Sequence, residues 1–217
     1  MMYNLGMEKY DKIITELRKI IPNPVCELDF RNNFELLVAV ILSAQCTDKC
    51  VNIVTKELFK EYDTPFKLAS ANPLDVEKII KPCGFYKNKA KHIIEASKQI
   101  VENYGGQVPS EMDKLISLSG VGRKTANVVR AVGFKIPAIA VDTHVFRVSN
   151  RLGLANASDV ETCEKQLTKN IKESDWIDAH HLILLFGRYY CKAISPNCKE
   201  CPFASGCKYY KEKNKWY

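Results

Sequence analysis

Apolar residues recur at helical spacing along almost the whole 217-residue chain, and no segment shows the sustained alternation typical of a β-strand. Residues 10–20 form the first such segment. Residues 34–44 are apolar on nearly every side, which predicts a buried central helix. Further helices are expected at 51–62, from Pro73 to the stop at Pro82, and at 88–104, 112–118, 123–132, 143–152, 160–171 and 176–190. The predicted fold class is therefore all-α.

Residues 118–129, LSGVGRKTANVV, interrupt this pattern with two glycines. A nucleotide P-loop would need a glycine five residues before Gly122 and a preceding strand, and a dinucleotide fingerprint would need a glycine at Thr125 in a βαβ unit. The interpretation that remains is a glycine turn that joins two helices. Gly120 and Gly122 allow positive φ and close backbone approach, and successive N–H groups beside a helix start form an anion site. A DNA phosphate fits such a site; the alternative is a tight turn that simply needed glycines.

Lys124 falls in the first turn of the helix expected after this turn. The positive end of a helix repels the protonated form of a lysine side chain there. The neutral amine that is favoured instead is a nucleophile that forms Schiff bases. The alternative is a lysine that contacts a phosphate. Asp142 directly precedes the predicted helix 143–152, as a helix N-cap does. An acid beside Lys124 would also accept its proton and stabilise a cationic sugar.

Four cysteines crowd the end of the chain in the pattern C-x6-C-x2-C-x5-C, which indicates a single four-thiolate centre. They are Cys191, Cys198, Cys201 and Cys207. The spacing matches neither a zinc ribbon nor the ferredoxin patterns, so zinc and an iron–sulfur cluster both remain open. The other five, Cys26, Cys46, Cys50, Cys83 and Cys163, are scattered, and ordinary buried thiols are expected there.

The chain carries a formal net charge of +7, which fits a polyanionic partner. Residues 191–217 hold six lysines against two glutamates, a net of +4 that is either a solvated tail or part of the binding surface. The longest early apolar run, residues 36–42, is too short to span a bilayer, and no signal peptide is recognised. These features predict a cytoplasmic, nucleoid-associated protein without membrane contact.

In this order the motifs resemble the endonuclease III family, the bifunctional DNA glycosylases and abasic-site lyases of the helix-hairpin-helix superfamily. The matching segments are FELLVAVILSAQCTD at 34–48, GFYKNKA at 84–90, LSGVGRKTANVV at 118–129, IAVDTHVFRVSNR at 139–151 and the terminal cysteines. The resemblance implies the helix-hairpin-helix glycosylase fold, with two helical domains and a DNA-binding cleft between them. Residues 25–135 would form a six-helix domain, and residues 1–24 with 136–217 a second domain carrying the cluster.

The same resemblance assigns roles to particular residues. Lys124 would be the Schiff-base nucleophile that removes an oxidised pyrimidine and nicks the strand by β-elimination, and Asp142 its catalytic carboxylate. Gln45 and Phe85 would fill the gap left by the flipped base, which suits one polar and one flat apolar side chain. The remaining DNA contacts would be Gly120, Gly122, Arg123 and His144, and a [4Fe–4S] cluster would be bound by Cys191, Cys198, Cys201 and Cys207. The expected partner is duplex DNA with a damaged base or abasic site, bound by a monomer.

Three alternatives differ from this in testable ways. A monofunctional glycosylase of the superfamily would carry a glutamate at the position of Ile41 and would lack Lys124. A non-catalytic DNA-binding iron–sulfur protein would need no pairing of Lys124 with Asp142. A structural zinc module would bind zinc at the four cysteines in place of the cluster.

Overall fold

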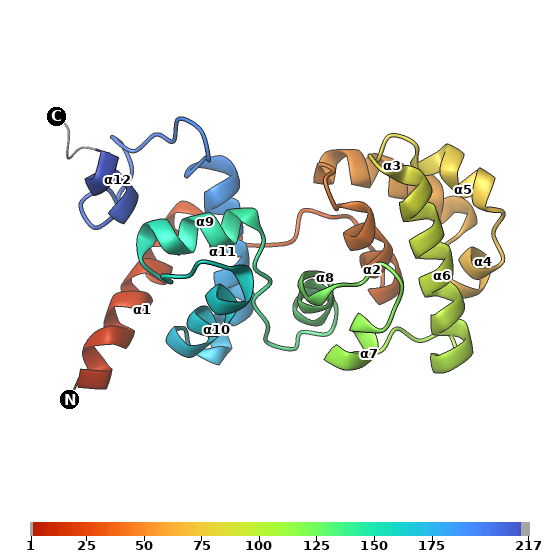
Figure 1. Ribbon diagram of the computed structural model, residues 1–217, viewed down its shortest axis with the longest axis horizontal. Coiled ribbons are helices and arrows are strands. Elements are labelled where there is room, and N and C mark those ends of the chain that lie inside the picture. Colours follow the sequence, from red (N-terminus) through yellow and green to blue (C-terminus); the bar gives the residue numbers. More distant parts are fainter. Residues whose placement is uncertain (1, 214–217) are drawn as a thin grey trace. The chain divides into compact units, whose positions relative to one another are not determined.

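The computed structural model describes residues 2–213, with side chains from residue 9 onward. Every regular element within that range is helical, which confirms the all-α prediction (Figure 1). The chain divides into two compact units. One comprises Glu27–Ile136, and the other joins the residues up to Cys26 with those from Pro137 onward.

The unit Glu27–Ile136 is built around helix α2, Asn33–Leu42, in which residues 34–42 are all buried. This confirms the central helix expected from its uniformly apolar sequence. The elements around it are α3 (Asp48–Glu61), α4 (Pro65–Ala69), α5 (Pro73–Ile80), α6 (Tyr86–Tyr104), α7 (Met112–Ile116), α8 (Arg123–Val128) and a π-helical turn at Val129–Gly133. Helices α4 and α5 both pack against α6.

One charged residue is buried at the start of the central helix. Glu35 is 1% exposed, and its carboxylate accepts hydrogen bonds from the main-chain N–H and the guanidinium of Arg31. Asn32 caps the same helix by accepting from the main-chain N–H of Glu35 at 3.0 Å. These partners replace the water that a buried carboxylate loses, so the charge is tolerated in this position.

The second unit combines the N-terminal helix with the C-terminal half of the chain. Its elements are α1 (Met2–Ile20), α9 (Thr143–Leu152), α10 (Val160–Asn170), a 3-10 turn at Glu173–Asp175, α11 (Trp176–Tyr189) and α12 (Lys208–Lys213). Leu17 of α1 and Phe186 of α11 lie in one apolar core. Arg18 adds two ion pairs to this contact, at 2.8 Å from Asp175 and 2.9 Å from Asp178.

Close packing of α9 on α11 depends on Gly187. A Cβ at that position would lie 2.9 Å from a Val148 methyl and 3.0 Å from the His144 Cβ, closer than side chains normally approach. Glycine therefore sets the distance between the helix that begins at Asp142 and the helix that leads to Cys191.

Several element boundaries differ from the sequence-based expectations. Helix α1 begins at Met2 and α6 at Tyr86, both earlier than expected, and the short helices α4 and α12 were not predicted. The helix expected at 123–132 turns from α-helical to π-helical at Val129. The basic tail expected after Cys207 is helical over Lys208–Lys213, and its last four residues lie outside the described range.

Candidate DNA-binding and catalytic site

The glycine turn at 118–122 joins α7 to α8 and is anchored by its apolar residues. Leu118 is 3% exposed and Val121 6%, so both side chains are buried as expected. Gly120 has φ +76°, a conformation that other residues rarely adopt. Gly122 is extended, with φ −96° and ψ 177°, and is the N-cap of α8. Only the first glycine therefore uses positive φ, while nothing lies within 4 Å of a Cβ placed at the second.

Helix α6 supports this turn through two polar side chains. Gln99 accepts a hydrogen bond from the main-chain N–H of Ser119 at 2.7 Å, and His92 Nδ1 lies 3.0 Å from the Ser119 hydroxyl. A proline at the position of Ser119 would have no N–H to donate. The serine therefore exchanges a rigid ring for two hydrogen bonds to α6.

Arg123 and Lys124 occupy the first turn of α8, and both are exposed. The N-cap residue of α8 is Gly122, which has no side chain that could accept from the N–H groups at the helix start. Two cations therefore stand beside main-chain N–H groups at the positive end of a helix, an arrangement that attracts anions.

Asp142 lies in the other unit and is the N-cap of α9, as the sequence predicts. Its Oδ1 accepts from the main-chain N–H groups of His144 and Val145, both at 2.8 Å. Both capping bonds use the same oxygen, so Oδ2 takes no part in the cap. The imidazole of His144 lies 3.2 Å from the guanidinium of Arg147, between its Nδ1 and Nη2.

Gln45 and Phe85 come from two loops of the Glu27–Ile136 unit that lie side by side. Both are exposed, Phe85 at 66%, and both have left-handed backbone, with φ 52° and 56°. A Cβ on Gly84 would lie 3.9 Å from the Gln45 carbonyl. Left-handed backbone is uncommon outside glycine and clusters at functional positions. Gln45 and Phe85 therefore place two residues with this uncommon backbone on adjoining loops.

Lys89 of α6, a residue that the sequence analysis missed, forms hydrogen bonds with the main chain just before Gln45. Its side chain is buried, at 5% exposed, and its ammonium donates to the carbonyls of Leu42 and Ala44 at 2.9 and 2.7 Å. The positive charge also faces the end of α2, where helix carbonyls favour a cation.

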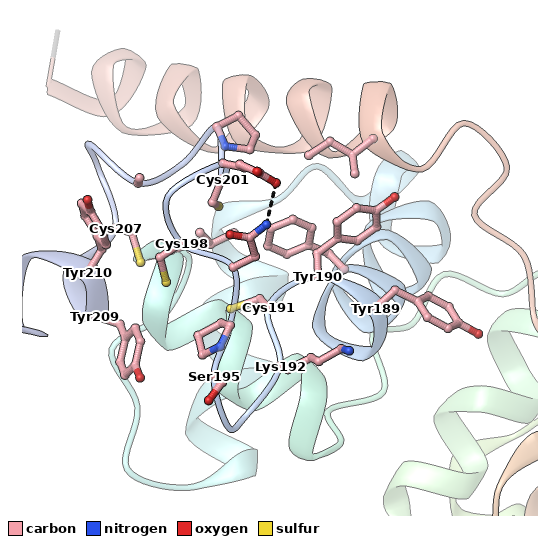
Figure 2. Close-up of a pocket in the computed structure, with 18 residues that line it drawn as sticks. Tyr189, Tyr190, Cys191, Lys192, Ser195, Cys198, Cys201, Cys207, Tyr209 and Tyr210 are labelled. Atoms are coloured by element: carbon pink, nitrogen blue, oxygen red, sulfur yellow. Dashed lines mark hydrogen bonds between the residues drawn. The ribbon is translucent and has the colours of Figure 1, made fainter.

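The four terminal cysteines surround one cavity of about 440 Å³ (Figure 2). Cys191 follows α11, Cys198 and Cys201 lie on the loop after it, and Cys207 precedes α12. This gathers the four residues that the spacing predicted to share a centre. Burial, and next the charges of Cys191 and Cys207, raises the pKa of the Cys198 thiol. Burial likewise is the main cause that raises the pKa of Cys201.

Two arginines of α9 hold this cysteine loop, and the sequence analysis did not single them out. Arg147 Nη2 donates to the carbonyls of Gly187 at 2.8 Å and Cys191 at 3.1 Å, and burial lowers its pKa. Arg151 donates to Cys191 Sγ at 3.4 Å and to the Lys192 carbonyl at 2.8 Å. It also lies 3.8 Å from the ring centre of Tyr209, a cation–π contact. Both arginines lie at i, i+4 on one helix, a signal visible in VFRVSNR.

The spread of the four sulfur atoms bears on what they bind. Across residues 2–213, one group of three or more potential ligands has its atoms all within 4.8 Å of one another, as a single ion requires, and that group is Cys46, Cys50 and Cys83. The terminal cysteines are therefore spaced more widely than ligands of one ion.

Comparison with known proteins shows the superfamily and the family to which this chain belongs. The model of the HhH-GPD superfamily of base excision DNA repair proteins matches residues 38–173. Endonuclease III of Bacillus subtilis is 48% identical over 212 residues, covering 97% of both chains, and that of Escherichia coli K12 is 44% identical over 202 residues, covering 93% of this chain and 95% of its own. The chain belongs to the endonuclease III family of this superfamily.

Solved structures agree with this assignment. A trapped endonuclease III–DNA covalent intermediate has a TM-score of 0.92 and 47% identity, covering 95% of this chain and 98% of its own. A thermostable thymine-DNA glycosylase, at 20% identity, shares the fold with a TM-score of 0.85. Among the helices of residues 2–213, none has the length and apolar character needed to cross a membrane.

Proposed function

We propose that this protein is a DNA glycosylase of base excision repair that removes oxidised pyrimidines from duplex DNA and then cleaves the strand as an abasic-site lyase. The observation that carries the proposal is an exposed lysine, Lys124, in the first turn of α8 behind a glycine turn. The same proposal places the protein at chromosomal DNA in the cytoplasm.

In the proposed reaction, the neutral amine of Lys124 attacks C1′ of the damaged nucleotide and the base leaves with the bonding electron pair. The attached amine then gives up its proton, and the C1′–O4′ bond opens with the electron pair and a proton going to O4′, which leaves an iminium at C1′. The iminium acidifies the hydrogen at C2′, and loss of that proton expels the 3′ phosphate by β-elimination. Asp142 is proposed to accept the proton of the attacking amine and to stabilise the cationic sugar. The oxygen left outside the α9 cap, Oδ2, is suited to this role.

Base flipping is assigned to the adjoining loops of Gln45 and Phe85. Extruding a nucleotide costs a few kcal/mol of stacking and pairing, and side chains must occupy the gap. The exposed ring of Phe85 is proposed to wedge between bases, while the amide of Gln45 pairs with the base left behind. Their left-handed backbone supports this role, because such conformations cluster at functional positions.

Phosphate contacts are assigned to the turn Gly120–Gly122, to Arg123 and to His144. The open space at Gly122 allows a phosphate oxygen to approach the main-chain N–H groups at the start of α8. Such contacts position the protein without reading sequence. Affinity is therefore expected to fall steeply as salt rises, because counterions released from DNA dominate the binding energy.

The two alternative functions are less well supported. Ile41, where a monofunctional relative would carry glutamate, is 5% exposed within the core of α2. A carboxylate there would need partners that this apolar helix does not offer. A non-catalytic binding protein could use the exposed Lys124 only as a phosphate contact and would form no covalent adduct with DNA, which the experiment below tests.

A [4Fe–4S] cluster is proposed to be bound by Cys191, Cys198, Cys201 and Cys207. The four thiols, the 440 Å³ cavity they line and the wide sulfur spacing all suit a multi-iron group. When bound, the cluster would cross-link the loop between α11 and α12 by four iron–thiolate bonds. Arg151 would donate a hydrogen bond to the Cys191 sulfur, and Arg147 would fix the Cys191 main chain. Chemical analysis of the purified protein is expected to find acid-labile sulfide and four iron atoms per chain.

Borohydride trapping tests the catalytic proposal directly. The substrate is a duplex with one oxidised pyrimidine, and the products are separated on a denaturing gel. We expect a covalent protein–DNA adduct whose peptide map places the DNA on Lys124. Lys124→Ala is expected to keep DNA affinity and to lose both adduct and nicking, whereas Lys98→Ala, an exposed lysine on α6, serves as the matched control.

The remaining outcomes discriminate among the alternatives. Base release without an adduct would make the enzyme a monofunctional glycosylase and reduce Lys124 to a phosphate contact. DNA binding with neither base release nor nicking, on several lesions, would favour the non-catalytic iron–sulfur protein. An adduct that persists in Lys124→Ala would assign the nucleophile to another amine.

A further inference from the structure

Three cysteines outside the terminal group converge in the Glu27–Ile136 unit. Cys46 lies in the loop after α2, Cys50 in the first turn of α3, and Cys83 in the loop between α5 and α6. Their sulfur atoms all lie within 4.8 Å of one another. The sequence analysis treated these residues singly as buried thiols, because Cys83 is more than thirty positions from the other two.

The spacing of the three sulfurs is close to that of a tetrahedral metal site. Zinc–sulfur bonds of about 2.3 Å place neighbouring thiolates about 3.8 Å apart in a tetrahedron, so closure requires shifts of about 1 Å. The Cys50 thiol donates to the Pro82 carbonyl at 3.7 Å, which puts an oxygen ligand at the edge of the group. Cys46 and Cys50 are partly exposed, so an ion has a route to the thiols.

Charge balance favours a metal ion at this position. Three thiolates and one Zn²⁺ carry a net charge of −1, and the buried ammonium of Lys89 is near enough to act on Cys50 and Cys83 electrostatically. The hydrogen-bond acceptors of Lys89 described above are two uncharged carbonyls. A buried lysine is rare without an anionic partner, and a zinc–thiolate group provides one.

In the absence of a metal ion, Cys50 and Cys83 are protonated thiols. Burial, followed by its contact with Cys46, raises the pKa of Cys83 to about 12. Burial is also the main cause that raises the pKa of Cys50. Thiols of this kind are poor nucleophiles and oxidise slowly, whereas a soft metal ion displaces their protons directly.

We propose that Cys46, Cys50 and Cys83 form a zinc site that clips the loop of Gln45 to the loop of Phe85. Cys46 directly follows Gln45, and Cys83 precedes Phe85 by two residues. Bound zinc would join the two loops by metal–sulfur bonds and hold both in their left-handed conformations. Metal binding is independent of the proposed function, and only the role of these loops on DNA rests on it.

Zinc binding is measured on the reduced, iron-loaded protein under anaerobic conditions. After equilibration with ZnCl₂ and gel filtration, bound zinc and iron are quantified on the same sample. We expect one zinc per chain with unchanged iron. Cys46→Ser, Cys50→Ser and Cys83→Ser are each expected to weaken zinc binding by about 100-fold or more, since even outer contacts cost 10- to 100-fold. Cys26→Ser, a thiol elsewhere in the chain, is the control and should bind zinc normally.

Hydrogen exchange tests the clip itself. Zinc is expected to slow exchange in residues 43–47 and 82–86 of the wild-type protein and to leave the three serine variants unchanged. A Cd²⁺ titration of the same samples should give a thiolate charge-transfer band that only proteins with all three cysteines show. Each variant is checked by circular dichroism, so that a folding failure is not counted as loss of the site.

Four results would overturn the proposal. They are absence of zinc from the wild-type protein, zinc retained when all three cysteines are replaced, zinc gained only as iron is lost, and a disulfide within the group that persists under the reducing conditions of the assay. An inactive glycosylase that binds zinc through these residues would leave this inference standing. An active one that binds none would overturn it and leave the proposed function intact.

Discussion

Replacing Gly120 by alanine should destabilise the Glu27–Ile136 unit far more than the same change at Gly122, only two residues away. At Gly120, φ is +76° and a Cβ would lie 2.8 Å from the His92 Cβ. At Gly122 the backbone is extended, and nothing lies within 4 Å of the added atom. Comparing Gly120→Ala with Gly122→Ala separates the cost of positive φ and of the steric clash at Gly120 from the general effect of adding a methyl group.

The magnitude follows from two terms. Left-handed backbone costs an L-residue roughly 1–2 kcal/mol, and forcing an atom into a filled site costs about 1–3 kcal/mol, so Gly120→Ala should lose about 2–5 kcal/mol. If His92 moves aside, its contact with Ser119 is lost, at about 1 kcal/mol within that range. For Gly122→Ala, the weaker N-cap and the stiffer unfolded chain offset each other, leaving stability within about 1 kcal/mol of wild type.

Urea denaturation followed by two signals measures this. Trp176 belongs to the other unit and packs against its core, so its fluorescence reports on that unit, whereas far-ultraviolet circular dichroism reports on both units. Gly120→Ala should lower the free energy of unfolding that is obtained from the circular dichroism transition. A loss below about 1 kcal/mol, or equal losses in the two variants, would refute the reasoning from φ and the His92 contact.

Three further predictions concern side chains. Asp142→Asn should abolish nicking yet keep stability, because an amide oxygen still accepts from the N–H groups of His144 and Val145, whereas Asp142→Ala should also lose about 1 kcal/mol in denaturation experiments. Arg147→Met should lower the iron content of the purified protein and cost about 2–3 kcal/mol, because the Gly187 and Cys191 carbonyls lose a charged donor; normal iron content would contradict this. Hydrogen bonds from the Thr162 N–H and hydroxyl lower the pKa of Asp159 below 3.8, so its stabilising effect is complete above that pH and is lost as pH falls through the folded value. A carboxyl titration midpoint at or above 3.8 in NMR would refute it, and Asp159→Asn should remove this part of the acid sensitivity.

The helical architecture was predictable because its signals are local. The apolar run at 34–42 has no polar face to expose, so burial at the centre of a unit was its only favourable environment. Asp142 was recognisable as an N-cap from its position before a helical segment. The cysteine spacing likewise predicted a shared centre, because four cysteines clustered at the end of the chain are typical of residues that bind one metal group.

What the sequence did not reveal depends on contacts between distant segments. The support of the glycine turn by His92 and Gln99 joins residues at least 20 positions apart. Lys89 reaches a loop 45 residues earlier, and nothing in its own neighbourhood distinguishes it from other lysines of α6. The switch to a π-helical turn at Val129 also has no local signal of proline or glycine at the position where it begins.

The left-handed backbone of Gln45 and Phe85 has a consequence for how the protein searches DNA. Each conformation costs an ordinary residue about 1–3 kcal/mol, which the rest of the fold sustains at all times. That energy is expended during folding, so none of it is required again at each nucleotide that the protein inspects. Under the role proposed for these loops on DNA, reshaping them would therefore not limit the search, and the cost would be a lower stability of the protein at all times.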